Sequence, residues 1–393
     1  MIDYSSFLGD TAKSIKPSGI RKFFDIAAEM ADVISLSVGE PDFRTPWHIR
    51  QAGIDSLEKG RTRYTPNRGY IELREEIASF LDRKYNLKYS PQTDVIVTVG
   101  GSEAIDLFIR AIVQQGDEVL IPEPSFVCYV PIVQMAGGKP VIIETKVENN
   151  FKLTAKELES HITEKTKALI LPYPNNPTGA IMNYEDLKPI ADLVEKHNLL
   201  VLSDEIYSEL SYGEKPHVSF ASIKNMQERT VVVNGFSKSH AMTGWRMGYA
   251  AGPTELIAVM TKLHQYAIMS APTTSQFASI VALKDGDENI DSMREEYNMR
   301  RRYIVKALNK LGLTCFEPEG AFYVFPSIKS TGLSSDEFCE KLIYSKKVAV
   351  IPGNAFGQCG EGFIRISYCY SLNHIKEALK RIEEMLEELK IIN

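Results

Sequence analysis

Residues 235–249 place a lysine, two serines and an arginine directly after a run of β-branched residues. The segment is GFSKSHAMTGWRMGY, and its polar members include Ser237, Lys238 and Arg246. A lysine amine held near buried elements has a lowered pKa and can form an imine with a carbonyl group. An arginine and a serine hydroxyl beside it can bind an anion. Taken alone, the segment is also consistent with a solvated loop.

A second cluster, Gly100-Gly101-Ser102-Glu103, follows the apolar run VIVTV and leads into a predicted helix. Glycine allows the backbone to approach a ligand closely, and the free N–H groups at a helix start attract a phosphate. The same pattern is also a common connection between a strand and a helix. The segment therefore predicts a phosphate site only in combination with other residues.

Two more clusters follow apolar runs further along the chain. Asp204 ends LLVLSD and Tyr207 follows three residues later, so that one helical turn would bring both to one side of a crevice. Asp204 could instead cap the helix that follows. Asn176 lies in NNPTG, which by itself is a strong turn signal.

Arg365 lies in GFIRISY, an otherwise apolar run. A buried guanidinium without a partner is costly, so Arg365 either faces solvent on an edge strand or binds a carboxylate with both of its terminal nitrogens. An imine-forming lysine, an acid with a tyrosine, an asparagine and a phosphate site with its own arginine together match the groups of pyridoxal phosphate. The combination therefore favours a site for that cofactor.

The elements that must position these residues follow an alternating pattern. Short runs that are apolar on both faces recur with helical stretches between them, as in residues 94–99, 118–122, 139–144, 167–172, 199–204 and 230–235. Such runs predict buried strands joined by crossover helices, the α/β pattern of a mostly parallel sheet. Ligands of such sheets bind at the carboxyl ends of the strands, where the candidate residues lie.

The last third of the chain changes character. A long charged helix is predicted near residues 291–312, followed by three apolar strands around 320–326, 348–353 and 362–368 and an amphipathic helix at 373–390. We therefore predict a large cofactor-binding domain over residues 46–284 and a smaller α+β domain. The smaller domain consists of residues 285–393 together with the N-terminal residues 1–45.

The amino-acid composition limits the kinds of molecule that this protein is expected to bind. The 393 residues carry a net charge of −6, which disfavours nucleic-acid and anionic membrane surfaces as partners. The five cysteines and seven histidines show no metal-binding spacing, so no metal is expected, and His197 and His264 are interpreted as packing or surface residues. There is neither a signal-peptide pattern nor a run of 18 apolar residues, and we expect a cytoplasmic protein that binds small molecules.

Eight segments in series resemble the fold-type I pyridoxal-phosphate-dependent aminotransferases of the aspartate and aromatic aminotransferase family. They span nearly the whole chain: LSVGEPDF, RYTPNRGYIELR, GGSEA, YPNNPTG, SDEIY, GFSKSHAMTGWRMGY, GAFYVFP and GFIRIS. The resemblance implies a large domain with a mostly parallel central sheet flanked by helices, and the smaller α+β domain described above. It also implies pyridoxal 5′-phosphate as the cofactor.

The resemblance implies a role for each candidate residue around the cofactor ring. Lys238 would form the imine with the cofactor and then carry a proton between the substrate's α carbon and the cofactor. Asp204 would keep the pyridine nitrogen protonated, because a protonated ring is the stronger electron sink. Asn176 and Tyr207 would hydrogen-bond the phenolic oxygen, and Phe126 would stack on the ring.

The phosphate and the substrate would lie at opposite ends of this site. The backbone of Gly101, Ser102 and Glu103 would hold the phosphate together with Ser237 and Arg246. Tyr64 would reach the phosphate from a neighbouring subunit, which implies a homodimer with shared active sites. Arg365 would bind the substrate's α-carboxylate, with help from the backbone at Gly39 and from Asn176.

Two positions depart from the pattern of some relatives. Where certain aspartate-preferring relatives have a lysine for the substrate's distal carboxylate, this chain has Ser102, which weakens an exclusive assignment to aspartate. Gly235 replaces a phosphate-binding hydroxyl found in other relatives, so the phosphate should depend more on Ser237 and Arg246.

The expected reaction is transfer of an amino group from an L-amino acid, aromatic or of broad range, to a 2-oxo acid such as 2-oxoglutarate. Aspartate or N-acyl-diaminopimelate is the alternative donor. A carbon–sulfur β-lyase would use the same lysine and aspartate. A DNA-binding regulator is disfavoured, because only about 35 residues precede LSVGEPDF and the net charge is acidic.

Overall fold

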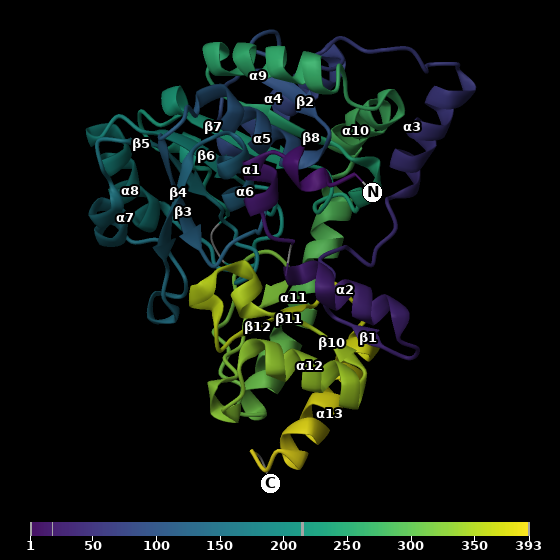
Figure 1. Cartoon of the computed structure of the whole chain (residues 1–393). Coiled ribbons are helices and arrows are strands. Elements are labelled where there is room, and N and C mark those ends of the chain that lie inside the picture. Colours follow the sequence, from purple (N-terminus) through teal and green to yellow (C-terminus); the bar gives the residue numbers. More distant parts are fainter. Residues whose placement is uncertain (1, 18, 214–215, 392–393) are drawn as a thin grey trace.

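A central sheet of seven strands organises the larger part of the molecule (Figure 1). The computed structural model describes residues 2–17, 19–213 and 216–391. The strand order is β2-β8-β7-β6-β5-β3-β4, and only β8 runs antiparallel to its neighbours. The strands are β2 (Val95–Thr98), β3 (Glu118–Glu123), β4 (Lys139–Glu144), β5 (Thr166–Leu171), β6 (Leu200–Asp204), β7 (Thr230–Gly235) and β8 (Gly248–Ala251). The predicted α/β class with a mostly parallel sheet is confirmed.

Helices cover both faces of this sheet, because successive residues of each strand point to opposite sides. In β7, Val231 and Val233 pack with α5 (Gly100–Ile112), α6 (Tyr129–Met135) and α9 (Thr254–Ala267). Val232 faces the other side, where α3 (Trp47–Glu58), α4 (Ile71–Tyr85) and α10 (Thr273–Asp285) lie. Further along that side, α7 (Ala155–His161) and α8 (Tyr184–Lys196) pack on β5 and β6. Both faces of the strands are therefore apolar.

The last third of the chain forms a separate layer of shorter strands and helices, drawn in green and yellow in Figure 1. The sheet β11-β12-β9 consists of β11 (Ile351–Pro352), β12 (Ile364–Ser367) and β9 (Tyr323–Val324), with β10 (Val348–Ala349) pairing separately with β1 (Ile34–Ser35). The helices around them are α11 (Asp287–Lys310), α12 (Ser335–Lys346) and α13 (Leu372–Glu388). The predicted strand at 320–326 is thus only two residues long.

The N-terminal segment contacts both parts of the molecule. Helix α2 (Gly19–Glu29) and β1 lie against the C-terminal layer, whereas α1 (Asp10–Ser14) lies near α6 of the large part (Figure 1). The division into residues 46–284 and residues 1–45 with 285–393 stays our proposal. No helix in the described part of the chain is long and apolar enough to cross a membrane.

Candidate active site

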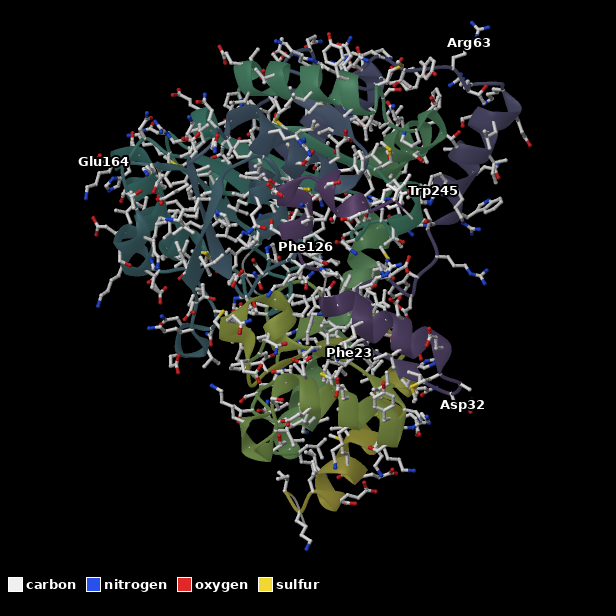
Figure 2. The ribbon with its side chains drawn as sticks, in the orientation of Figure 1. Phe23, Asp32, Arg63, Phe126, Glu164 and Trp245 are labelled. Carbon is white, nitrogen blue, oxygen red and sulfur yellow. The ribbon has the colours of Figure 1, made fainter. Side chains whose placement is uncertain are left out.

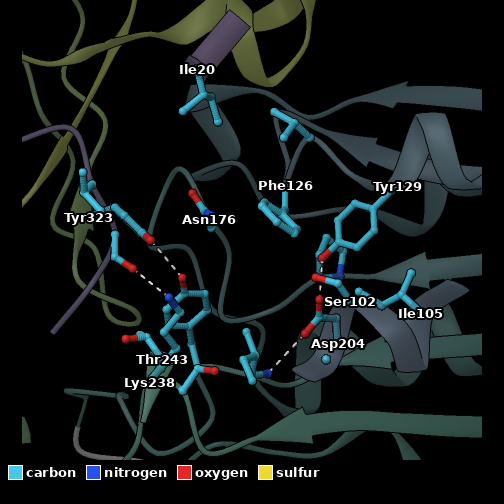
Figure 3. Close-up of a pocket in the computed structure, with 18 of the residues that line it drawn as sticks. Ile20, Ser102, Ile105, Phe126, Tyr129, Asn176, Asp204, Lys238, Thr243 and Tyr323 are labelled. Atoms are coloured by element: carbon cyan, nitrogen blue, oxygen red, sulfur yellow. Dashed lines mark hydrogen bonds between the residues drawn. The ribbon is translucent and has the colours of Figure 1, made fainter. Parts of the chain in front are cut away.

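A cavity of about 510 Å³ opens where the carboxyl ends of the central strands meet the C-terminal layer. Figure 3 shows it from close by, and in Figure 2 the ring of Phe126 lies at the same junction. Most of the residues predicted for a site line it: Gly39, Gly101, Ser102, Phe126, Asn176, Asp204, Tyr207, Ser237, Lys238, Arg246 and Arg365. Two predicted residues, Glu103 and Tyr64, are not among those lining residues. The side chains gathered here thus come from segments spread over the whole sequence.

Lys238 follows β7 and extends its amine into this cavity (Figure 3). Its Nζ donates a hydrogen bond of 2.7 Å to the backbone oxygen of Gly39 and lies 5.8 Å from the centre of the Phe322 ring. Burial lowers the pKa of the Lys238 amine to about 8. About a tenth of this amine is therefore uncharged at neutral pH, far more than of an ordinary lysine, which favours a nucleophilic role.

Asp204 ends β6 and is buried at the bottom of the cavity. Its Oδ2 accepts a hydrogen bond of 2.7 Å from the Tyr129 hydroxyl, and its Oδ1 accepts one of 3.2 Å from the backbone N–H of Ile206. Burial raises the pKa of Asp204 to about 6, and the described residues give it no basic partner. Residues 206–209 form turns rather than a helix, so the alternative role as a helix cap is wrong.

The Gly100-Gly101 turn lies where β2 passes into α5. Gly100 has φ +74°, and a Cβ there would come within 2.6 Å of Arg246 Nη2. Arg246 Nη1 in turn donates to the backbone oxygen of Thr243 at 3.0 Å. No side chain caps the start of α5, so its first N–H groups and the adjacent guanidinium are available to an anion.

Arg365 is buried between two aromatic rings, so the alternative of a solvent-facing edge position is wrong. Its guanidinium carbon lies 4.6 Å from the centre of the Tyr323 ring and 4.7 Å from that of Phe356. Nη1 donates to Asn176 Oδ1 at 3.0 Å and Nη2 to the Ser37 backbone oxygen, whereas the buried Nε finds no partner among the residues that the structure describes. Because no carboxylate neutralises it within the described residues, this cation suits an anionic ligand.

A pair of tyrosines connects the two halves of the cavity. The hydroxyls of Tyr207 and Tyr323 lie 2.9 Å apart, and burial raises the pKa of Tyr207 well above its usual range. The Tyr323 hydroxyl occupies space that a side chain at position 39 would need, since a Cβ on Gly39 would lie 1.8 Å from it. Phe322, the neighbour of Tyr323 in the segment GAFYVFP, is buried and is not among the residues that line the cavity.

Three functional candidates were missed by sequence reasoning. Tyr129 bonds Asp204, Tyr323 bonds Tyr207, and His264 is fully buried with its Nδ1 2.6 Å from Glu103 Oε1. His264 had been interpreted as a packing or surface residue, and its burial excludes the surface. Tyr129 lies in the segment EPSFVCY beside Phe126 and Tyr323 lies in GAFYVFP, so both had a signal nearby in sequence, whereas His264 had none.

The described residues contain no group of three or more histidine, cysteine, aspartate or glutamate side chains placed to hold a metal ion. The five cysteines are free thiols. A buried amine of lowered pKa, a buried carboxylate without a basic partner, an open helix start and a buried arginine without an acid share one cavity. Together with the doubly covered sheet, this site defines an α/β protein whose cavity presents an amine, an acid and two groups suited to anions.

Comparison with known proteins identifies the family. The family model described as aminotransferase class I and II matches residues 31–382, and the chain belongs to this family. YugH of Bacillus subtilis, whose name gives an aminotransferase without a substrate, is 52% identical over 384 residues, 98% of this chain and 99% of the relative. An aspartate aminotransferase of Pyrococcus abyssi is 47% identical over 386 residues, 98% of this chain and 99% of the relative.

Relatives named for aromatic amino acids match this chain about as well as the aspartate aminotransferase does. Aromatic-amino-acid aminotransferase 2 of Thermococcus litoralis is 45% identical over 387 residues, 98% of this chain and 100% of the relative. The crystal structure of an aromatic aminotransferase from Pyrococcus horikoshii superposes with a TM-score of 0.90 at 45% identity, covering 94% of this chain and 100% of that one. The family, the fold and the enzyme class are thereby established.

Proposed function

We propose that this aminotransferase uses pyridoxal 5′-phosphate to move the amino group of an aromatic L-amino acid, or of a broad range of L-amino acids, to a 2-oxo acid such as 2-oxoglutarate. The observation that carries the proposal is that several ionisable side chains share one cavity without a partner of opposite charge among the described residues. Lys238, Asp204 and Arg365 are each buried or half-buried there, and the described residues give none of them a partner of opposite charge. The cavity is thus complementary to charges that the protein itself does not supply.

These residues fit the three reactive parts of pyridoxal phosphate. The Lys238 amine would bind the aldehyde, and the Asp204 carboxylate would pair with the protonated pyridine nitrogen. The start of α5 at Gly101 and Ser102, with Ser237 and Arg246, would hold the phosphate. The backbone of Glu103 would contribute there as well. When bound, the cofactor withdraws electrons from the substrate's α carbon and makes its proton labile.

The chain's own groups account for the remaining steps. Arg365 would bind the substrate's α-carboxylate, and the backbone at Gly39 and the Asn176 amide would complete that contact. Lys238, once released by the incoming amine, would remove the proton from the α carbon and pass it to the cofactor. Tyr207 and Asn176 would hydrogen-bond the phenolic oxygen of the ring, and Phe126 would cover one ring face. The burial of Asp204 would limit the access of water to its contact with the ring nitrogen.

The lining of the cavity near α2 supports an apolar substrate side chain. Ile20, Phe24, Ile105, Phe126 and Val127 all face it. Ser102 is the polar residue where an aspartate-preferring relative would carry a lysine. Aspartate and N-acyl-diaminopimelate remain the alternative donors, because segments such as SGIRKF and SDEIYSELSY are similar to those of enzymes with these names.

We also propose a homodimer in the cytoplasm. Tyr64 is 82% exposed and is not among the residues that line this chain's own cavity, which supports a role in the cavity of a second copy. Sedimentation of the purified protein would test the dimer. A monomer that is fully active at nanomolar concentration would contradict shared sites.

A panel of amino acids incubated with purified protein, pyridoxal phosphate and 2-oxoglutarate tests the activity, with glutamate as the measured product. We expect aromatic donors to give the fastest formation of glutamate. Absence of glutamate with every donor would overturn the proposal. The carbon–sulfur β-lyase alternative predicts pyruvate and ammonia from cystathionine without any 2-oxo acid, which the same samples can report.

A further inference from the structure

The helix start that would hold the phosphate carries an acid in its first turn. Glu103 is the fourth residue of α5, and a carboxylate there places a negative charge near the site proposed for a dianion. Two negative charges that lie close together repel each other. The side chain of Glu103 is nevertheless only 9% exposed and is not among the residues that line the cavity, so it is held by specific contacts.

Both carboxylate oxygens of Glu103 are occupied. Oε2 accepts a hydrogen bond of 2.5 Å from the backbone N–H of Val99, the last residue before the Gly100-Gly101 turn. Oε1 lies 2.6 Å from Nδ1 of His264 on α9. Because an ionised carboxylate only accepts hydrogen bonds, the histidine must carry its proton on Nδ1 in this contact. The acid therefore links the end of β2 to a neighbouring helix.

His264 is committed to this contact. Its side chain is fully buried, and Nε2 has no hydrogen-bond partner among the described residues. A buried polar ring that makes a single hydrogen bond gains little stability from its burial alone. The geometry therefore fits a histidine that holds the Glu103 carboxylate away from the cavity.

The peptide that Glu103 fixes is the one that enters the phosphate turn. Gly100 has φ +74°, and the turn packs tightly on β8, since a Cβ on Gly248 would come within 2.6 Å of the Gly101 backbone nitrogen. The N–H groups that follow can serve an anion only while this turn keeps its shape. The hydrogen bond from the Val99 N–H to the Glu103 carboxylate connects the residues on either side of this turn.

We propose that Glu103 and His264 are positioning residues that hold the Gly100-Gly101 turn in the conformation that binds the phosphate of the cofactor. The inference rests on the proposed use of pyridoxal phosphate and extends it to two side chains that do not touch the ligand. It predicts that their loss weakens recognition of the phosphate and leaves recognition of the ring and aldehyde unchanged.

The test compares two ligands on the protein freed of cofactor: pyridoxal phosphate and pyridoxal, which lacks the phosphate. Dissociation constants are measured for the wild type, Glu103→Ala, His264→Ala and the double variant. We expect each single change to weaken pyridoxal phosphate binding ~10-fold, the value of one buried hydrogen bond to a charged group, with pyridoxal within ~2-fold of the wild type. The double variant should be little worse than either single one, because both act through one contact.

Two conservative variants and one control complete the design. Glu103→Gln keeps an oxygen for the Val99 N–H, and His264→Asn keeps a donor for Glu103, so both should restore most of the affinity. Asp106→Asn changes an acid on the same helix that pairs with Arg110 instead, and it should leave both constants unchanged. Variants that unfold are recognised by their circular dichroism, and the conservative pair then carries the test.

Three results would overturn the inference. One is Glu103→Ala binding pyridoxal phosphate as tightly as the wild type. Another is an equal loss for pyridoxal, which indicates a general structural role. A wild type that discriminates in no way between the two ligands would refute the proposed cofactor itself, and it is distinguishable because it appears before any variant is made.

Discussion

The two ends of the cavity would hold the proposed cofactor phosphate and the substrate carboxylate in different ways. The phosphate end is made mostly of backbone, with the start of α5, two glycines and an exposed arginine on neighbouring strand ends of one sheet. The carboxylate end depends on one buried guanidinium, Arg365, which is held by segments far apart in sequence. A backbone cradle tolerates changes of side chain but no added Cβ at Gly100, whereas the arginine end depends on that single side chain. Substitutions at the two ends should therefore affect different measurable constants.

Loss of the Lys238 amine, which lies between the two ends of the cavity, should have the largest effect on turnover. Lys238→Ala removes the amine and should lower turnover at least ~1,000-fold, because both attachment of the cofactor and proton transfer are lost. The cofactor phosphate should still bind, since that end is untouched. Glutamate formation and the absorbance of lysine-bound cofactor measure the two parts. Exposed Lys262 provides the control, as Lys262→Ala should behave like the wild type.

Arg365→Ala should lower kcat/KM by about 100-fold or more, because it removes a desolvated charge that the substrate carboxylate would meet. The dissociation constant of pyridoxal phosphate should stay within about 2-fold of the wild type, since one hydrogen bond at most is altered near the ring. Lysine cannot reproduce the planar two-nitrogen contact, so Arg365→Lys should recover only part of the activity. If affinity for pyridoxal phosphate fell as much as kcat/KM, the proposal that the two ends of the cavity act independently would be contradicted.

Gly100→Ala should act at the phosphate end alone. Alanine meets both a positive φ and a Cβ contact with Arg246 there, and we expect pyridoxal phosphate to bind about 10-fold more weakly, with KM for the amino acid unchanged. Gly116→Ala is the matched control, because Gly116 has φ +91° and no heavy atom within 4 Å of its added Cβ. Equal losses in both variants would show that conformational strain, and not the cradle, causes the effect.

Tyr323→Phe should have the smallest effect of the series. It removes the hydroxyl that bonds Tyr207 and leaves the ring beneath Arg365, so turnover should fall about 2- to 10-fold, the value of one neutral hydrogen bond. The effect should appear in kcat more than in KM for the substrate. Steady-state kinetics with one aromatic donor measure this effect. An unchanged kcat would show that the Tyr323 hydroxyl has no role in turnover.

Sequence reasoning located the central strands and the residues that share the cavity where short local motifs mark them. The six predicted strands were found, and eleven of the predicted site residues line one cavity, because strand ends with glycine or polar residues are visible in a window of a few residues. The seventh strand, β8, is short and glycine-containing, so no apolar run marked it. Tyr129, Tyr323 and His264 were missed because their roles depend on contacts between residues more than 70 positions apart.

The β7–β8 hairpin has a consequence for the order in which the molecule assembles. Lys238 and Arg246 lie on one antiparallel connection, so their neighbourhood forms from contacts close together in the chain. Arg365 reaches Ser37 across 328 positions, and that contact must wait until nearly the whole polypeptide has collapsed. We expect pulsed hydrogen exchange during refolding to protect the amides of residues 231–251 before those of residues 364–367. The enzyme would then acquire its anchor for the cofactor before its anchor for the substrate's carboxylate.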